Sequence, residues 1–312
     1  MPKVAPRASA KPGVFHRPIH ITFIGAGSDF TPRLVSDFLQ MPGADRGTFA
    51  LVDVDDTRLQ LIARVVKKLV KLHGKDGWSV VASTKRSDVM PGSHYIVNCI
   101  EVGGLDCVKH DYEIPLKYGV DQCIGDTVGP GGVFKALRTI PAWIEILDEA
   151  GQTCPEALVL NYTNPMSMMC LAAAQASKLP VVGLCHSVQA TSELLARRAG
   201  VPYGDLAWEC AGINHLAWFT KLEHKGKDLY PALMAKARDD LAGKPSDPRD
   251  AGDLVRKDIM VRFGAFVTES SGHLSEYVPY YRKRKDLLAK YCGAGYDGES
   301  GFYAREWPKW RK

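Results

Sequence analysis

Short apolar segments and amphipathic helical segments alternate along the first 185 residues of the chain. Residues 19–24 form an apolar, β-branched run of strand length, and residues 31–39 follow with the spacing of a helix. Residues 59–70 repeat apolar positions three and four apart, which predicts an amphipathic helix. Further strands are predicted at 50–54, 80–82, 94–100, 157–160 and 181–184, and further helices at 136–149 and 167–176. This alternation predicts an α/β fold with a mostly parallel, doubly wound sheet.

The first predicted strand ends in a glycine turn that is typical of nucleotide binding. Gly25, Gly27 and Ser28 precede the next helix, where glycine lets the backbone approach a pyrophosphate at the positive helix end. The third glycine of the usual fingerprint is absent, because Phe30 stands there. Asp53 ends the strand at 50–54, and an acid there binds the ribose of NAD and repels the 2′-phosphate of NADP. These features predict a Rossmann-like NAD-binding domain, unless Asp53 only caps the following helix.

Composition and charge indicate a folded protein and give no sign of a nucleic-acid or membrane partner. The 312 residues contain no apolar run of membrane-spanning length. The net charge is only +5, and residues 1–18 form a basic segment without the apolar centre of a secretory signal, which predicts a disordered tail. The eight cysteines show no regular spacing, which favours a reducing cytoplasm. The charged stretch at 236–258 predicts a surface excursion.

Two motifs in the second half of the chain contain possible metal ligands. One is Gly-Leu-Cys-His-Ser-Val-Gln at 183–189, and the other is Gly-Ile-Asn-His-Leu at 212–216. Cys185 is a soft ligand and His215 a borderline one, so the two could hold a transition-metal ion. The alternative is a buried thiol and a core histidine.

The motifs together resemble glycoside hydrolase family 4. The resemblance rests on the glycine turn with the Phe-Thr pair after it, on the two metal motifs, and on Asn-Tyr-Thr-Asn-Pro at 161–165. The residues around Cys185 and in the segment Ser-Glu-Tyr-Val-Pro at 275–279 are most similar to those of the α-galactosidase (melibiase) branch. The resemblance extends over about residues 19–282. It implies a glycosidase that uses NAD and Mn²⁺, or another divalent metal, to hydrolyse α-galactosides or related α-glycosides. We expect the protein to be a cytoplasmic homodimer or homotetramer.

The implied reaction is a redox route rather than the usual two-carboxylate mechanism. NAD oxidises the sugar at C3, a base removes the C2 proton, and the leaving group at C1 is eliminated. Water then adds and the hydride returns. The metal polarises the carbonyl, because a sugar C2–H is otherwise too weak an acid.

The resemblance also implies roles for individual residues. Cys185 and His215 match the metal ligands, and Asn164 matches an asparagine that contacts the substrate hydroxyls. Glu101 and Gly103 lie in a segment similar to the family loop beside the nicotinamide, although the segment could be an ordinary turn after a strand.

The proton-transfer groups are harder to assign. Tyr277 is the expected base, with Tyr280 and Tyr281 as rivals, and it can act only if its pKa is lowered from roughly 10. His273 is expected to touch the substrate, or alternatively the metal.

The leaving-group acid has two candidates. Phospho-glycosidase relatives have an aspartate directly after the metal cysteine, whereas this chain has His186. His186 can donate a proton near neutral pH, and Asp126 is the other candidate. The same departure disfavours a phosphorylated substrate.

The expected domains are the tail at 1–18, an NAD-binding domain at 19–185, and an α+β substrate and metal domain at 186–312. The last is shorter than in the family, which predicts either a fragment or a naturally short form. Two other functions remain open. One is an NAD-dependent 2-hydroxy-acid dehydrogenase of the lactate/malate type, which needs no metal, and the other is a non-catalytic, truncated NAD-binding protein. The Cys185 and His215 pair discriminates against the dehydrogenase.

Overall fold

The computed structural model describes residue 15 and residues 17–245 and 251–310, in two compact units. Unit 1 comprises Met1–Glu101, Ala142–Thr163 and Cys170–Gly183, and unit 2 comprises Val102–Pro141, Asn164–Met169 and Leu184–Lys312. The expected domain boundary at residue 185 lies near the last crossing between the units and stays a prediction. The tail expected at 1–18 lies almost wholly outside the described residues.

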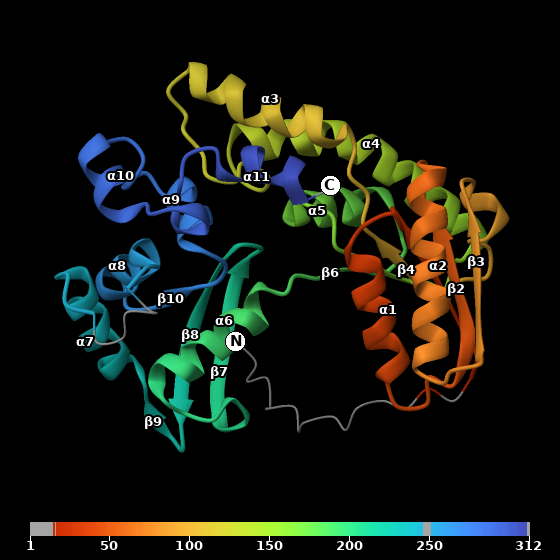
Figure 1. Ribbon diagram of the computed structural model, residues 1–312, viewed down its shortest axis with the longest axis horizontal. Coiled ribbons are helices and arrows are strands. Elements are labelled where there is room, and N and C mark those ends of the chain that lie inside the picture. Colours follow the sequence, from red (N-terminus) through yellow and green to blue (C-terminus); the bar gives the residue numbers. More distant parts are fainter. Residues whose placement is uncertain (1–14, 16, 246–250, 311–312) are drawn as a thin grey trace. The chain divides into compact units, whose positions relative to one another are not determined.

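Unit 1 is built on a six-stranded sheet in which all pairs are parallel (Figure 1). The spatial order is β3-β2-β1-β4-β5-β6, which is the strand order of dinucleotide-binding folds. The strands are β1 (Ile19–Ile24), β2 (Arg46–Val52), β3 (Gly77–Ser83), β4 (Tyr95–Asn98), β5 (Leu158–Asn161) and β6 (Val181–Gly183). The predicted Rossmann-like, doubly wound parallel sheet is confirmed.

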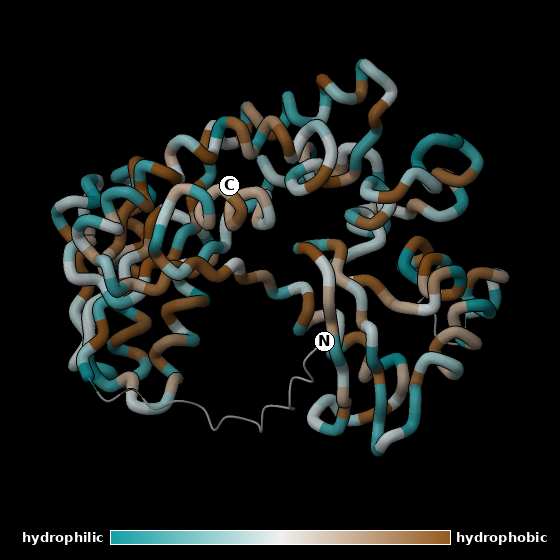
Figure 2. The backbone as a smooth tube through the Cα atoms, turned by 180° about the vertical axis from the view of Figure 1, so that it is seen from behind, coloured by the Kyte–Doolittle hydropathy of each residue, from teal (hydrophilic) through white to brown (hydrophobic). Residues whose placement is uncertain are grey.

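Helices α1 (Phe30–Gln40) and α2 (Asp56–Leu72) lie side by side on this sheet (Figure 1). Asp55 caps α2, because its side chain accepts a hydrogen bond from the Arg58 amide at 3.1 Å. The helices alternate between hydrophobic and hydrophilic residues (Figure 2). The apolar stripe expected at 59–70 is buried, at Leu59, Ile62, Ala63, Val66 and Val70.

The predicted elements match the observed ones best where apolar runs are continuous. The bounds of β1 are those predicted, whereas β2 begins four residues before its apolar run because Arg46 and Thr48 lie on a half-exposed stretch. Helix α4 (Pro130–Thr153) is longer than expected, and helix α3 (Gly104–Lys117) was not predicted. Helix α5 (Met166–Ala176) agrees closely with its prediction.

Unit 2 combines helices with a small antiparallel sheet, ordered β10-β8-β7 with β9 paired to β8. Its strands are β7 (Leu206–Ile213), β8 (Leu216–His224), β9 (Lys227–Asp228) and β10 (Phe266–Val267). Its helices include α3, the first half of α4, α6 (Ser187–Ala199), α7 (Tyr230–Leu241), α8 (Leu254–Phe263), α9 (Ser271–Tyr277), α10 (Lys285–Tyr291) and α11 (Phe302–Trp310). The predicted C-terminal α+β region is confirmed.

The predicted surface excursion at 236–258 is wrong for its described C-terminal part. Asp253 is buried, and so are Arg256, Lys257 and Asp258 on α8. Their charges are compensated inside the unit: Arg256 pairs with Asp253 at 2.6 Å, and Lys257 pairs with Asp240 at 2.6 Å. The charged sequence therefore conceals a buried ionic cluster, which composition alone does not distinguish from a solvated loop.

In the described part of the chain, no helix is long and apolar enough to cross a bilayer. All eight cysteines are free thiols.

Candidate metal and substrate site

His215 lies at the tip of the hairpin formed by β7 and β8. Ile213 pairs with Leu216, so Asn214 and His215 form the two-residue connection. His215 has a φ of +62°, in the left-handed region that a side chain with a Cβ rarely occupies. Its ring is buried, and Nδ1 lies 3.0 Å from the Thr127 hydroxyl. The hairpin thus fixes the position of the ring, and Thr127 from another segment contacts one of its nitrogens.

The other nitrogen of His215 faces Cys185. The His215 Nε2 atom lies 3.4 Å from Cys185 Sγ. Cys185 follows β6 in the chain, just before α6, and its Sγ also lies 3.3 Å from the Ser187 hydroxyl. Burial raises the pKa of the Cys185 thiol, while the hydrogen bonds from Ser187 oppose that shift. The two expected metal ligands therefore meet in the structure.

Glu269 completes this group and was not identified from the sequence. It follows β10, has a φ of +73°, and places Oε2 at 3.9 Å from His215 Nε2. The ligand atoms of Cys185, His215 and Glu269 all lie within 4.8 Å of one another. A lone glutamate before a serine pair has no characteristic spacing to either metal motif, so only the fold reveals it.

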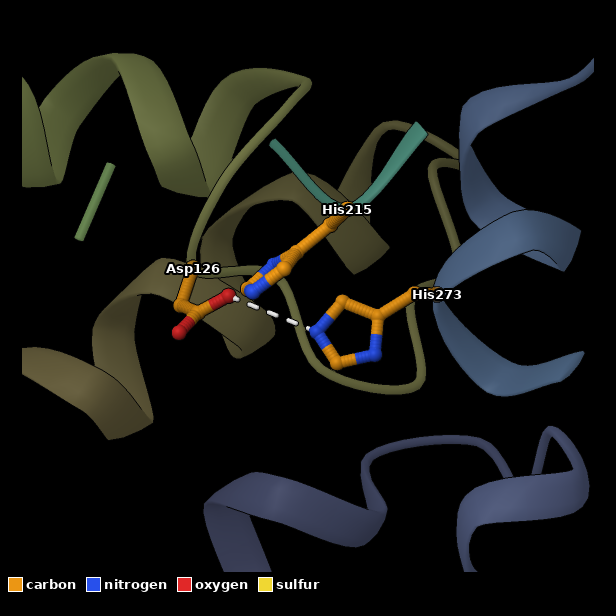
Figure 3. A group of neighbouring side chains, drawn as sticks. All are labelled: Asp126, His215 and His273. Carbon is orange, nitrogen blue, oxygen red and sulfur yellow. Dashed lines mark ion pairs between the residues drawn. The ribbon is translucent and has the colours of Figure 1, made fainter. Parts of the chain in front are cut away.

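A second group shares His215 and adds Asp126 and His273 (Figure 3). Asp126 comes from the segment 118–129 between α3 and α4, and His273 comes from α9. The His273 Nε2 atom lies 3.8 Å from Asp126 Oδ1, and its Nδ1 atom lies 3.6 Å from Glu269 Oε1. Both imidazoles and the carboxylate point toward one another from separate segments of unit 2 (Figure 3).

The charges in this group are strongly coupled. Burial alone would raise the pKa of Asp126, but its contact with His273 and the charge of Lys135 lower that pKa well below the ordinary range. Burial would lower the pKa of His273, yet Asp126 and Glu269 raise it. Burial and the charge of His273 lower the pKa of His215 to about 4. His215 is therefore neutral near pH 7 and has a free electron pair for a metal.

Asn164 joins the second group through Asp126. Its amide nitrogen donates to Asp126 Oδ2 at 3.1 Å. Asn161, in unit 1, braces the loop instead, because its side chain donates to the Thr163 carbonyl at 3.0 Å and accepts from Asn98 at 2.8 Å. The structure thus separates the two asparagines of the motif into a site residue and a supporting residue.

Tyr277 and His186 flank the group in different ways. Tyr277 lies on α9 one turn after His273, with 5.9 Å between the ring centroids. Its hydroxyl is buried and has no hydrogen-bond partner among the described residues. Burial and the charge of Glu276 raise the Tyr277 pKa well above its usual value, and Thr127 only partly opposes this shift. His186 is exposed and precedes α6.

The glycine turn of unit 1 lies at the switch point of the sheet, where the chain reverses from β1–β3 to β4. Gly25 has a φ of +77°, and a Cβ there would stand 2.5 Å from the Cys99 carbonyl oxygen. The Gly27 amide donates to Asp53 Oδ2 at 2.7 Å, and the Asp55 amide donates to Asp53 Oδ1 at 3.0 Å. Asp53 therefore orients the turn, while Asp55 caps α2.

The remaining expected cofactor residues are Ser28 and Glu101 in unit 1 and Gly103 in unit 2. Ser28 continues the turn, and its amide donates to the Gly25 carbonyl at 3.1 Å. Glu101 is the last residue of the first segment of unit 1. Gly103 belongs to unit 2 and precedes α3 with a φ of +85°.

The parallel dinucleotide-type sheet and the thiol–imidazole–carboxylate cluster define an α/β protein with the elements of a nucleotide site and a metal site. The chain belongs to the family 4 glycosyl hydrolases, since residues 20–201 match that family's model and residues 210–306 match the model of its C-terminal domain. The expectation from the sequence motifs is confirmed.

Relatives with known activities are similar over most of the chain. An α-galactosidase of Rhizobium meliloti (strain 1021) is 38% identical over 289 residues, which cover 91% of this chain and 58% of that protein. An α-galactosidase of Bacillus subtilis (strain 168) is also 38% identical, over 85% of this chain and 60% of that protein. The chain thus spans about three fifths of the length of these relatives.

The fold is similar to a solved 6-phospho-β-glucosidase of Thermotoga maritima. The TM-score is 0.71 and the identity 25%, over 93% of this chain and 64% of that one. That structure contains manganese, NAD⁺ and glucose-6-phosphate.

Proposed function

We propose that the chain is an NAD- and divalent-metal-dependent glycosidase that hydrolyses α-galactosides or related α-glycosides. The observation that carries the proposal is the convergence of Cys185, His215 and Glu269 within 4.8 Å in a chain of this family. The relatives at 38% identity are α-galactosidases, which supports the substrate class. The glucosidase of Thermotoga maritima with manganese and NAD⁺ supports the cofactors.

The donor atoms fit a divalent first-row metal. A thiolate, a neutral imidazole and a carboxylate present one soft, one borderline and one hard ligand. We propose that Cys185, His215 and Glu269 hold the ion, with Thr127 orienting the imidazole through Nδ1. When bound, the metal would supply positive charge that polarises a sugar carbonyl. Cys185 must lose its proton for binding, against the raised pKa that burial gives its thiol.

The turn after β1 fits a dinucleotide. A side chain at Gly25 would collide with the Cys99 backbone, so the close approach of the two backbone segments depends on glycine. We propose that Gly25, Gly27 and Ser28 contact the pyrophosphate and that Asp53 binds the adenosine ribose. Glu101 and Gly103 are proposed to lie beside the nicotinamide. Bound NAD would supply the hydride acceptor and later the donor at C3 of the sugar.

We propose that Asn164, Asp126 and His273 bind hydroxyl groups of the sugar. Asn164 donates to Asp126, and Asp126 faces His273, so donors and acceptors alternate along the group. Tyr277 is the proposed acceptor of the C2 proton. Its buried hydroxyl has no hydrogen-bond partner among the described residues and lies next to this group, but it needs added positive charge to lower its raised pKa.

The two candidates for the leaving-group acid are Asp126 and His186. The lowered pKa keeps Asp126 ionised near neutral pH, and an ionised carboxylate cannot donate a proton. We therefore favour His186, which is exposed next to Cys185.

We further propose a cytoplasmic homodimer or homotetramer. The eight free cysteines support a reducing compartment. Large exposed apolar side chains, among them Phe134 and Leu137 on α4, support an oligomer contact.

The test is an assay of the purified full chain on a nitrophenyl α-galactoside, with NAD, manganese and a thiol reductant each omitted in turn. We expect hydrolysis only when all three are present, with NAD required but not consumed. NADH accumulating in proportion to turnover would overturn the proposal in favour of a dehydrogenase. Intact NAD binding without hydrolysis under any condition would indicate a non-catalytic binding protein.

A further inference from the structure

The segment 118–129 brings two site residues into place without regular secondary structure of its own. Thr127 lies 3.0 Å from Nδ1 of His215, and Asp126 accepts from Asn164 at 3.1 Å. A loop that must position side chains this closely needs fixed points along its backbone, because free loop conformers would otherwise compete with the productive one.

Glu276 supplies such a fixed point. Its Oε2 atom accepts hydrogen bonds from the Cys123 amide at 2.7 Å and the Ile124 amide at 2.9 Å, and its Oε1 atom accepts from the Gly125 amide at 2.9 Å. Three consecutive amides thus point at one half-buried carboxylate. Hydrogen bonds to an ionised acceptor are stronger than neutral ones, so this contact holds the backbone immediately before Asp126.

Helix α9 carries residues of the site and also the residue that holds the segment 118–129. Glu276 lies on α9, three residues after His273 and directly before Tyr277. The start of the segment is secured separately, because Arg282 pairs with Asp121 at 2.7 Å. Loss of the Glu276 contact is therefore expected to loosen residues 123–127 while the rest of the segment stays attached.

We propose that Glu276 is a positioning residue of the metal site. By fixing residues 123–125 it holds the Thr127 hydroxyl against Nδ1 of His215, so that Nε2 is the nitrogen presented to Cys185. The inference rests on the proposed function, in that the ligand of this site is a divalent metal. It adds a connection from α9 to the metal that runs through backbone amides, and Glu276 itself need not touch the ion.

The experiment compares the full chain with Glu276→Gln, in which one acceptor oxygen becomes an amide NH₂ group, a donor that faces backbone N–H donors. The matched control is Glu299→Gln, because Glu299 also accepts from a backbone amide, that of Gly295 at 2.8 Å, but lies outside the site. Each protein is titrated with Co²⁺ alone, whose absorption reports both thiolate binding and ligand geometry. Hydrogen exchange of the amides at 123–125 is measured on the metal-free proteins.

We expect Glu276→Gln to weaken Co²⁺ binding by about 10- to 100-fold, to shift the ligand-field bands at saturation, and to speed exchange at 123–125. The control should change none of these. Thr127→Val removes the hydroxyl that contacts Nδ1 of His215 and leaves the Glu276 contact in place. It should shift the same bands with unchanged exchange, and the double variant should lose little further Co²⁺ affinity. This second variant keeps the proposal testable if Glu276→Gln folds poorly, because unshifted bands in Thr127→Val would overturn it.

Native affinity and native bands in Glu276→Gln would overturn the inference even if its stability fell, since a merely structural role moves only stability. The proposed function fails in a different way: the wild-type chain would then show no thiolate absorption with Co²⁺ at all. That outcome would overturn the inference as well, but the two failures are distinguished by the wild-type titration.

Discussion

His215 and Glu269 both hold a left-handed backbone, with φ of +62° and +73°, and their side chains meet at 3.9 Å between Nε2 and Oε2. Such a conformation costs roughly 1–3 kcal/mol for a residue other than glycine. The surroundings enforce it: the β7–β8 hairpin holds His215, and the Arg256 guanidinium donates to the Glu269 carbonyl. Strain at two facing ligand candidates indicates that the fold sacrifices stability for their placement.

Glycine at position 269 should reveal this strain. The free energy of unfolding should be about 1 kcal/mol higher for Glu269→Gly than for Glu269→Ala, because glycine adopts positive φ without a Cβ clash. Glu269→Gly should therefore unfold at a higher denaturant concentration. Both variants should bind Mn²⁺ more weakly than the wild type. Chemical unfolding with parallel metal titration measures both effects. Equal stability of the two variants would mean that the backbone at 269 is unstrained.

The thiol and the imidazole should each be essential for the metal. Cys185→Ser and His215→Ala should abolish manganese binding and activity while NAD affinity stays unchanged, since the turn after β1 belongs to unit 1. Thiol oxidation should inactivate the wild type in the same way, because only a reduced cysteine can bind the ion. Full manganese occupancy in either variant would contradict the assignment.

Asp53 should contribute to NAD binding beyond its structural contact with Gly27. Asp53→Ala should weaken NAD binding by roughly 1–3 kcal/mol, the cost of an unpaired hydrogen-bonding site. Asp55→Asn is the matched control, because asparagine caps a helix as well as aspartate does. Calorimetric titration with NAD decides the point, and an equal loss in Asp55→Asn would show that the effect is not specific to Asp53.

The buried cluster around Asp253 predicts a pH-dependent stability. Burial opposes ionisation of Asp253, but the charges of Arg256 and Arg198 prevail and lower its pKa from 3.8 to about 2. A carboxyl with a lowered folded-state pKa stabilises the fold above its unfolded pKa and loses that contribution as the pH falls. About 2 kcal/mol should therefore be lost between roughly pH 4 and pH 2.

Denaturant titrations across this range test the effect. Asp253→Asn should be less stable at neutral pH and should show a flatter pH dependence than the wild type. Asp286→Asn removes an exposed ion pair with Arg284 and serves as the control. A wild-type acid slope that survives unchanged in Asp253→Asn would show that other carboxyls cause it.

The sequence predicted the parallel sheet well because its strands are short, largely buried runs, as in β1, and end in recognisable turns. Cys185 and His215 were also visible, as was Asn164, because each lies in a motif. The β7–β8 hairpin was missed because several of its residues are half-exposed and its turn, Asn-His, lacks the glycine that usually marks one.

Glu269 and Glu276 could not be identified in the same way. Each acts through a tertiary contact, Glu269 with His215 in the turn between β7 and β8, and Glu276 with amides about 150 residues earlier. No local spacing records such a contact. The buried charges of α8 were misjudged for the same reason, because their partners become apparent only when the chain is folded.

Hydrolysis in deuterated water tests the central claim most directly. The proposed route breaks the C2–H bond of the sugar, a bond that two-carboxylate glycosidases leave intact. We expect the full chain, supplied with NAD and manganese, to release sugar labelled with deuterium at C2, and we expect Tyr277→Phe to lose this label. Hydrolysis that yields unlabelled sugar and proceeds without NAD would contradict the redox route, even if the substrate were an α-galactoside.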